Sequence, residues 1–208
     1  MTNDSTRNLR PAVFLDRDGT INHERNYLHK IDDFELIPGI PEALQKLQNA
    51  GFLLVVVTNQ SGVARGYFSL QDVKVLNDYM CLKLAEYGVK FDGIYICPHH
   101  PTAGIGEYLL DCNCRKGKPG MLQQAARDLA IDLKRSYMVG DKVSDAEAGN
   151  AAGCRSVLVQ TGYGTEQKKR SCLLPYPSLR DLSEAADYIV NDFKRDKVDH
   201  PPLGTDDC

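Results

Sequence analysis

Short apolar runs alternate with amphipathic stretches along most of the chain. The apolar runs predict buried strands at residues 12–16, 52–58, 91–97, 136–140 and 156–160. Between these runs, apolar positions recur at helical spacing and predict helices at 40–50, 70–87, 121–130 and 143–152. Strands that alternate strictly with helices are typical of a parallel sheet with helices on both faces. The sequence therefore predicts an α/β fold.

Local signals and two breaks in the pattern define the expected domain organisation. Gly51, Gly88 and Gly153 stand just beyond three predicted helices, as C-terminal glycines do, and Ser69 is a good N-cap for another. Residues 99–118 lack periodic apolar content, and the chain turns polar after residue 190. We expect one domain at 11–193, with a metal-binding loop at 97–118, a polar arm at 1–10 and a mobile tail at 194–208.

Composition restricts the classes of function. The chain has 208 residues, enough for one sizeable core, and its 42% hydrophobic and 25% charged content is that of a soluble globular protein. A net charge of −3 without a dense basic stripe argues against nucleic-acid binding. No apolar run approaches the roughly 20 residues of a membrane span, and the polar N-terminus does not look like a signal peptide. We expect a cytoplasmic monomer that binds neither nucleic acid nor membrane.

Two carboxylates follow the first predicted strand, one residue apart. Asp16 and Asp18 lie in Asp-Arg-Asp-Gly-Thr, where Asp-Gly marks a tight turn. Open α/β sheets bind ligands at this carboxyl edge of their strands. On its own this pattern fits ordinary loop carboxylates equally well.

Further polar groups come at the ends of other predicted strands. Thr58 precedes Asn59, Gln60 and Ser61, a turn that suits phosphate oxygens although a purely turn-forming role also fits. Asp141 ends another strand, with Asp145 one helical turn later, and Arg115-Lys116 precedes a helix. In a parallel sheet Asp16, Asp18, Thr58, Lys116 and Asp141 converge on one crevice. Clustered acids need a cation such as Mg²⁺, and a lysine and a hydroxyl beside it suit a phosphoryl group.

Four potential zinc ligands lie close together in the sequence. They are Cys97, His99, Cys112 and Cys114. Three cysteines and one histidine form a closed structural Zn²⁺ set, although two reduced thiol pairs in a loop also fit. The remaining cysteines, Cys81, Cys154, Cys172 and Cys208, are expected to be free thiols.

The ordered motifs DRDGT, VTNQSG, RK and VGDK resemble those of the haloacid dehalogenase-like phosphohydrolases, from residue 12 to about residue 160. The resemblance implies a Rossmann-like sheet, Mg²⁺ and hydrolysis through an aspartyl-phosphate. Carried over by position, Asp16 is the nucleophile and Asp18 the general acid/base. Asp16, the backbone carbonyl of Asp18, and Asp141 would hold Mg²⁺, while Thr58 and Lys116 would hold the phosphoryl oxygens.

A narrower resemblance, carried by FLDRDGTIN, VVVTNQSGVARG, CPHHP, CNCRK, PGML and YMVGDK, is to the heptose bisphosphate phosphatases of that family. It implies a small phosphorylated sugar as substrate, in the synthesis of ADP-heptose or GDP-heptose for surface polysaccharide. It also implies structural Zn²⁺, with His99 rather than His100 as the ligand. The implied substrate contacts are Glu24, Arg25, Asn26, Tyr27, Thr58, Asn59, Gln60, Ser61, Arg115, Lys116 and Lys142.

One departure from the family pattern leaves an alternative open. Gly117 replaces the usual first proline and Lys118 precedes the second, so Lys116 and Lys118 compete for one role, which we assign to Lys116. Two other functions also stay open. Histidinol-phosphate phosphatases share the acid motifs and the zinc loop, and a non-catalytic, zinc-organised binding module would keep the fold without the reaction.

Overall fold

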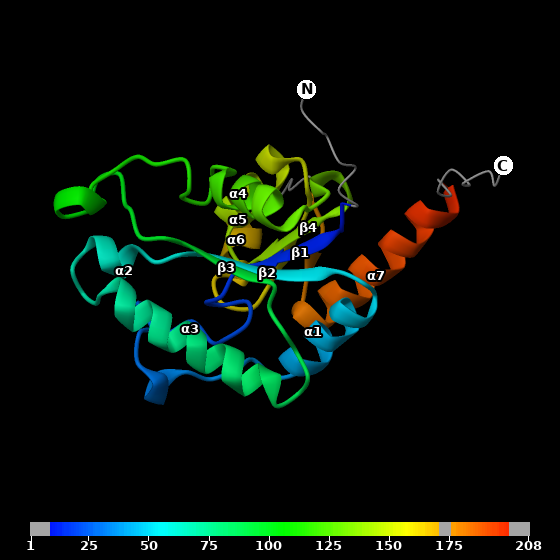
Figure 1. The fold of residues 1–208 in the computed structure, drawn as a ribbon, viewed down its shortest axis with the longest axis horizontal. Coiled ribbons are helices and arrows are strands. Elements are labelled where there is room, and N and C mark those ends of the chain that lie inside the picture. The colour runs from blue at the N-terminus through cyan, green and yellow to red at the C-terminus, as the bar shows by residue number, and fades with distance from the viewer. Residues whose placement is uncertain (1–8, 171–175, 200–208) are drawn as a thin grey trace, which may run out of the picture.

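The strands of this computed structural model, which describes residues 9–170 and 176–199, lie in one parallel sheet. Their order across the sheet is β3-β2-β1-β4-β5-β6 (Figure 1). The strands are β1 (Ala12–Leu15), β2 (Leu53–Asn59), β3 (Gly93–Cys97), β4 (Tyr137–Gly140), β5 (Arg155–Val159) and β6 (Ser178–Leu179). The parallel α/β sheet predicted from the sequence is confirmed.

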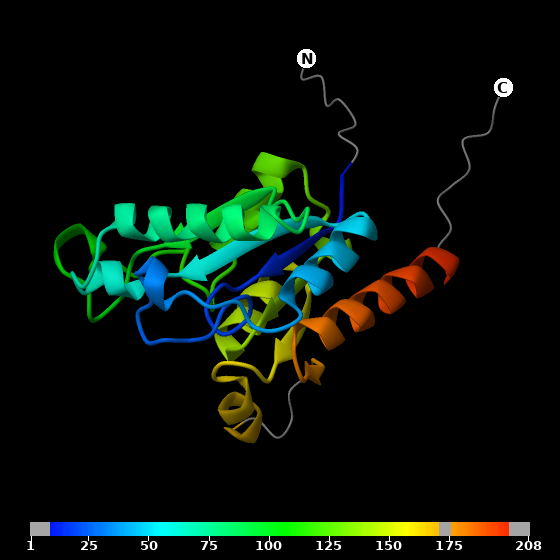
Figure 2. The same ribbon diagram turned by 90° about the horizontal axis from the view of Figure 1, so that it is seen from below.

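Helices cover both faces of the sheet. They are α1 (Ile40–Asn49), α2 (Ser61–Ala64), α3 (Leu70–Ala85), α4 (Gly120–Leu129), α5 (Val143–Ala152), α6 (Gly164–Arg170) and α7 (Leu182–Asp199). Helices α1, α3 and α7 lie on one face, from which Figure 2 views the molecule, and α4 and α5 lie on the other (Figure 1). None of the helices in the described residues is long and apolar enough to cross a membrane.

Strand β1 shows how the apolar runs build two cores at once. Its side chains are fully buried and alternate between the faces, as the two-residue period of a strand requires. Val13 and Leu15 pack in the core beneath α1 and α7, whereas Ala12 and Phe14 pack in the core beneath α4. Burial on both faces explains why the central strands read as continuous apolar runs.

The local signals agree with the observed helix ends. Gly51, Gly88 and Gly153 adopt positive φ angles of 95°, 73° and 89°, which glycine tolerates best. Ser69 caps α3 in a capping box with Asp72. Two observed boundaries differ from the predicted ones by two residues. Strand β3 starts at Gly93 and not at residue 91, and helix α3 ends at Ala85 and not at residue 87.

The C-terminal third contains elements that the pattern did not predict. Helices α6 and α7 and the two-residue strand β6 follow β5, and α7 continues to Asp199. Residues 194–199, expected as the start of a mobile tail, are therefore helical. Residues 200–208, Cys172 and most of the predicted N-terminal arm lie outside the described residues.

The long segment between β3 and α4 is tied to its surroundings by backbone hydrogen bonds. Ile105 N donates to Ala64 O at the end of α2, at 2.8 Å, and Gly117 N donates to Ser144 O of α5, at 2.9 Å. A single 3₁₀ turn, Gly106–Tyr108, is its only regular element within the described residues. The bond to Ala64 anchors the segment beside α2, at the carboxyl end of β2 (Figure 1).

Candidate active site

The turn after β1 brings two carboxylates to the carboxyl edge of the sheet. Asp16 N donates to Val139 O of the adjacent strand β4, at 2.9 Å, so the first acid continues the sheet pairing. Gly19 then turns the chain with a φ of 83°, and a Cβ at this position would collide with the Asp141 carboxylate. The turn can therefore pack directly against the acid that follows β4.

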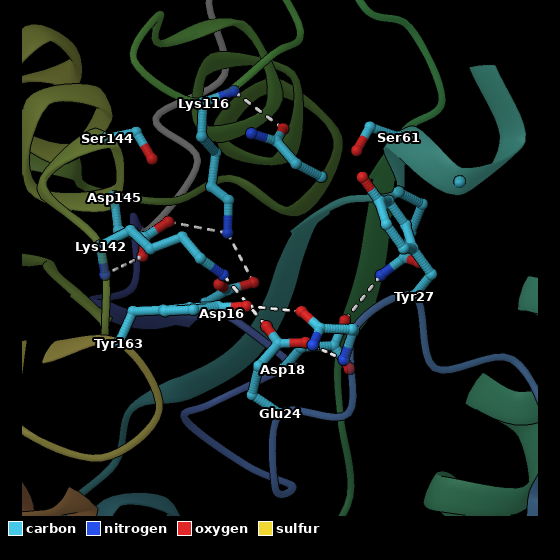
Figure 3. A pocket seen from close by; sticks show the side chains of 14 residues that line it. Asp16, Asp18, Glu24, Tyr27, Ser61, Lys116, Lys142, Ser144, Asp145 and Tyr163 are labelled. Carbon is cyan, nitrogen blue, oxygen red and sulfur yellow. Dashed lines mark hydrogen bonds and ion pairs between the residues drawn. The ribbon is translucent and has the colours of Figure 1, made fainter. Parts of the chain in front are cut away.

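Lys116 lies between two of the acids. Its Nζ is 2.6 Å from Asp16 Oδ1 and 2.8 Å from Asp145 Oδ1, and the side chain is 2% exposed (Figure 3). Burial alone would lower the pKa of Lys116, but the charges of Asp145 and Asp16 outweigh it and raise the pKa. A buried ammonium beside a carboxylate is suited to hold the oxygens of a transferred phosphoryl group.

The structure also distinguishes Lys116 from Lys118, the two candidates for the phosphate-binding lysine. The backbone N of Lys116 donates to Asn59 Oδ1 at 3.0 Å, which fixes the lysine at the end of β2. Lys118 is half exposed and forms its ion pair with Asp111, at 2.6 Å. Only Lys116 of the two contacts the site acids.

Asp18 is held by a buried arginine, Arg17, which was not among the predicted site residues. Arg17 is fully buried, and its Nη2 lies 2.9 Å from Asp18 Oδ2. Asn22 and Gln60 donate to the same carboxylate at 3.0 and 2.9 Å. Burial would raise the pKa of Asp18, but the Arg17 charge and these hydrogen bonds outweigh it and lower the pKa. Asp18 is therefore a firmly positioned carboxylate at the cavity wall.

Three acids form a set of donors that fits a divalent cation. Asp16, Asp141 and Asp145 each offer an oxygen, and these atoms lie within 4.8 Å of one another. Among the described residues Asp141 Oδ1 is buried without a hydrogen-bond donor, and Lys142 Nζ is 3.6 Å away. Burial raises the pKa of Asp141 to about 7, with Asp16 and Asp145 adding to the rise and Lys142 opposing it. Crowded carboxylates with a spare oxygen match the hard donors that Mg²⁺ prefers.

The cavity above these groups has a volume of about 210 Å³ (Figure 3). The predicted residues that line it are Asp16, Asp18, Glu24, Asn26, Tyr27, Asn59, Gln60, Ser61, Lys116 and Lys142. Thr58 and Asp141 are buried behind this lining, and Thr58 Oγ1 accepts a hydrogen bond from Gln60. The structure adds Gly62, Ser144, Asp145 and Tyr163 to the wall.

Two arginines predicted to contact substrate lie elsewhere. Arg25 forms an exposed ion pair with Glu35, at 2.9 Å, and is not among the residues that line the cavity. The Arg115 guanidinium donates to His99 O, at 3.0 Å, within the metal-binding loop. Neighbours in a sequence do not share a side-chain direction, so Glu24 and Lys116 reach the cavity while Arg25 and Arg115 do not.

The four predicted zinc ligands come together. Their ligand atoms lie within 4.8 Å of one another, with Cys114 Sγ 3.1 Å from Cys112 Sγ and 3.4 Å from both Cys97 Sγ and His99 Nδ1. A tetrahedral zinc ion with bonds of about 2.0–2.3 Å spaces such atoms roughly 3.5–3.8 Å apart, so these atoms need to move apart by only a few tenths of an ångström to bind one. The cluster therefore fits Zn²⁺, and His100 instead accepts hydrogen bonds from Thr102 N and Ala103 N.

Known proteins are similar to this chain in sequence and in fold. The haloacid dehalogenase-like hydrolase family matches residues 13–153, and a HAD-hydrolase-like family matches residues 113–195. A D-glycero-beta-D-manno-heptose-1,7-bisphosphate 7-phosphatase of Pasteurella multocida is 53% identical over 84% of this chain and 95% of its own. The Escherichia coli K12 protein of that name is 46% identical over 87% of this chain and 88% of its own.

A solved structure agrees with these sequence relatives. The D,D-heptose 1,7-bisphosphate phosphatase of B. bronchiseptica, complexed with magnesium and phosphate, has a TM-score of 0.78 and 34% identity. The match covers 88% of this chain and 99% of that one. The fold and the charged site are those of a hydrolase that cleaves phosphoric monoesters. The chain belongs to the haloacid dehalogenase-like hydrolase family.

Proposed function

We propose that this enzyme hydrolyses the C7 phosphate of D-glycero-D-manno-heptose 1,7-bisphosphate, for the synthesis of a nucleotide-activated heptose. The observation that carries the proposal is the buried contact of Lys116 with Asp16, the residue proposed as nucleophile, in the wall of a small polar cavity. The names of the relatives specify the β anomer, which we take as the substrate.

We further propose that residues 11–193 act as one domain, while the monomeric state and cytoplasmic location stay predictions.

The chain's own residues account for each chemical step. An Asp16 oxygen attacks phosphorus to form an aspartyl-phosphate as the bond from phosphorus to the sugar oxygen breaks, and Asp18 gives that oxygen the proton that it takes from water in each turnover. Asp18 then takes a proton from a water molecule, whose oxygen attacks the same phosphorus and releases inorganic phosphate from Asp16. Lys116 and the Thr58 hydroxyl hold the phosphoryl oxygens during both transfers.

A divalent cation fits the acidic side of this site. Asp16, the backbone carbonyl of Asp18, and Asp141 would hold Mg²⁺, and Asp145 offers a further oxygen within the same cluster. When bound, Mg²⁺ would neutralise the negative charge that the carboxylates and the phosphoryl oxygens bring together. Glu24, Asn26 and Tyr27 would contact the sugar, with Asn59, Gln60, Ser61 and Lys142 on the remaining walls.

A panel of phosphate esters tests the proposed substrate. We expect kcat/KM for heptose 1,7-bisphosphate to exceed that for histidinol phosphate and for other sugar phosphates. A preference for histidinol phosphate would support the alternative function and contradict the proposal. The second alternative, a non-catalytic binding module, is disfavoured because the family is one of hydrolases and the acids and lysine of the site are in contact.

Magnesium should be required for turnover but not for holding zinc. Protein dialysed into magnesium-free buffer should lose activity, because the carboxylates of Asp16, Asp141 and Asp145 then repel the phosphoryl group. Added Mg²⁺ should restore the rate, and elemental analysis should find about one zinc per chain throughout. Full activity in magnesium-free protein would refute the requirement.

Loss of zinc should slow catalysis through Lys116. Cys114→Ser removes a thiolate from the cluster two residues before Lys116, so the loop that fixes this lysine should lose its order. Misplacing a catalytic group by about 1 Å costs on the order of 10²-fold in rate, which is the loss in kcat/KM that we expect. Zinc content and turnover are measured on the same sample.

The matched control is Cys81→Ser, a half-buried thiol on α3 outside the cluster, which should keep both zinc and turnover. A zinc-free Cys114→Ser protein with the parental kcat/KM would show that the loop does not position Lys116.

A further inference from the structure

The turn between β5 and α6 carries Tyr163, an aromatic residue that lines the active-site cavity. Thr161 Oγ1 donates to Gly19 O at 2.6 Å, which joins this turn to the turn that carries Asp16. A Cβ at Gly162 would collide with the Asp141 carboxylate and lie 2.7 Å from Gly19 Cα, and one at Gly164 would collide with Val159 O. Only glycine allows this approach on either side of Tyr163.

Tyr163 uses its backbone and its side chain for different contacts. Its backbone N donates to Asp141 Oδ2, at 2.8 Å, so the residue is anchored to the acidic cluster whatever its side chain does. The ring lines the cavity, and the phenol donates to Asn26 Oδ1, at 2.7 Å. The Tyr163 side chain therefore connects the β5–α6 turn to the segment 24–27 (Figure 3).

Lys142 reinforces the same connection. Its Nζ lies 4.9 Å from the centre of the Tyr163 ring, a cation–π distance, and 3.3 Å from Glu24 Oε2. Tyr163 and Lys142 thus contact adjacent parts of the segment 24–27 from the opposite wall of the cavity. In Figure 3 the labelled Tyr163 and Lys142 side chains both extend toward Glu24, beside Asp16 and Asp18.

The backbone of this segment needs to be held. Asn26 and Tyr27 have φ angles of 47° and 63°, two consecutive left-handed residues without a glycine. Such conformations are unfavourable for residues that carry a Cβ, and they persist only where surrounding contacts impose them. The hydrogen bond from the Tyr163 phenol is one such contact, and the edge-on packing of Tyr27 on Tyr67 is another.

We propose that Tyr163 is a specificity-determining residue, which holds the segment 24–27 against the cavity and so fixes where the sugar lies relative to Asp16. The inference rests on the proposed sugar phosphatase function and adds a residue that the resemblance did not supply. A phosphoryl group near Asp16 and Lys116 contacts groups that are positioned independently of this segment. The contribution of Tyr163 should therefore appear with a sugar phosphate and not with a small phosphate ester.

Tyr163→Phe tests this role, because it removes the phenol and keeps the ring and the backbone contact with Asp141. With the preferred sugar phosphate, KM should rise roughly 3- to 10-fold, the scale of one lost hydrogen bond, while kcat changes little. With acetyl phosphate as the small substrate, the change in KM should be clearly smaller. Tyr188→Phe, an exposed tyrosine on α7, is the matched control and should leave both substrates unaffected.

A second variant tests whether the effect runs through the segment 24–27. Asn26→Gly removes the acceptor side chain, and glycine adopts a φ of 47° without strain. Since both changes remove the same hydrogen bond, the double variant should raise KM no further than the larger single change. Additive effects, or equal changes in KM for the sugar phosphate and acetyl phosphate, would overturn the proposal.

The wild-type panel separates this inference from the function on which it rests. A wild-type enzyme that hydrolyses sugar phosphates, with a Tyr163→Phe variant of unchanged KM, would overturn only the role of Tyr163. A wild-type enzyme that hydrolyses no sugar phosphate would overturn both proposals.

Discussion

Asp16→Asn should give a folded protein without measurable phosphatase turnover. An amide nitrogen or oxygen does not form the covalent phosphoryl intermediate, so the loss in kcat should be on the order of 10⁴- to 10⁶-fold, as when other enzymes lose a nucleophile. The fold should persist because Lys116 keeps its contacts with Asp145 and Val57 O, both at 2.8 Å. Phosphate release and thermal unfolding are measured on the same preparation.

The control for this change is Asp32→Asn, which alters an exposed carboxylate in a 3₁₀ turn outside the cavity. It should turn over at the parental rate. An Asp16→Asn protein with activity near that of the parent would remove Asp16 as the nucleophile, and with it the proposed aspartyl-phosphate.

Asp18→Asn should lower turnover of the sugar phosphate by roughly 10²- to 10⁴-fold, the usual contribution of general acid–base catalysis. The effect on phosphorylation of Asp16 should depend on the leaving group of the substrate. Acetate leaves without needing a proton, so acetyl phosphate should still phosphorylate Asp16 and release about one acetate per site before turnover slows. The sugar phosphate, whose alkoxide needs the proton, should show no such rapid phase. Rapid-quench measurement of acetate and sugar release distinguishes these cases.

The same substitution should also destabilise the protein. Arg17 is fully buried, and Asp18 is its ion-pair partner at 2.9 Å. Breaking one side of a buried pair costs about 3–5 kcal/mol, which denaturant unfolding would detect. An Asp18→Asn protein with parental turnover of the sugar phosphate would contradict the role of Asp18. A rapid phase with that substrate would contradict its role as the acid.

The parallel sheet was predictable because its central strands are buried on both faces and stand out as apolar runs. Helix α7 was harder to recognise. Its buried residues Leu182, Ala185, Ile189 and Phe193 recur at helical spacing, but charged residues between them make the segment look polar. Strand β6 has only two residues, which is too short for a period to show.

The site was predictable where it depends on topology. Asp16, Asn59 and Asp141 meet because parallel strands end at one edge of a sheet, and this follows from the order of strands and motifs. Side-chain direction does not follow from that order, which is why Arg25 and Arg115 were expected at the cavity. Tyr163 was missed for a related reason, since its place depends on the packing of Gly162 against Gly19 and not on a recognised motif.

Product analysis tests the central claim most directly. The purified enzyme, with Mg²⁺, is incubated with D-glycero-D-manno-heptose 1,7-bisphosphate and followed by phosphorus NMR. We predict that the C7 phosphate signal is replaced by inorganic phosphate while the C1 phosphate signal remains. Loss of the C1 phosphate, or an unchanged bisphosphate in a preparation that hydrolyses histidinol phosphate, would contradict the proposed function.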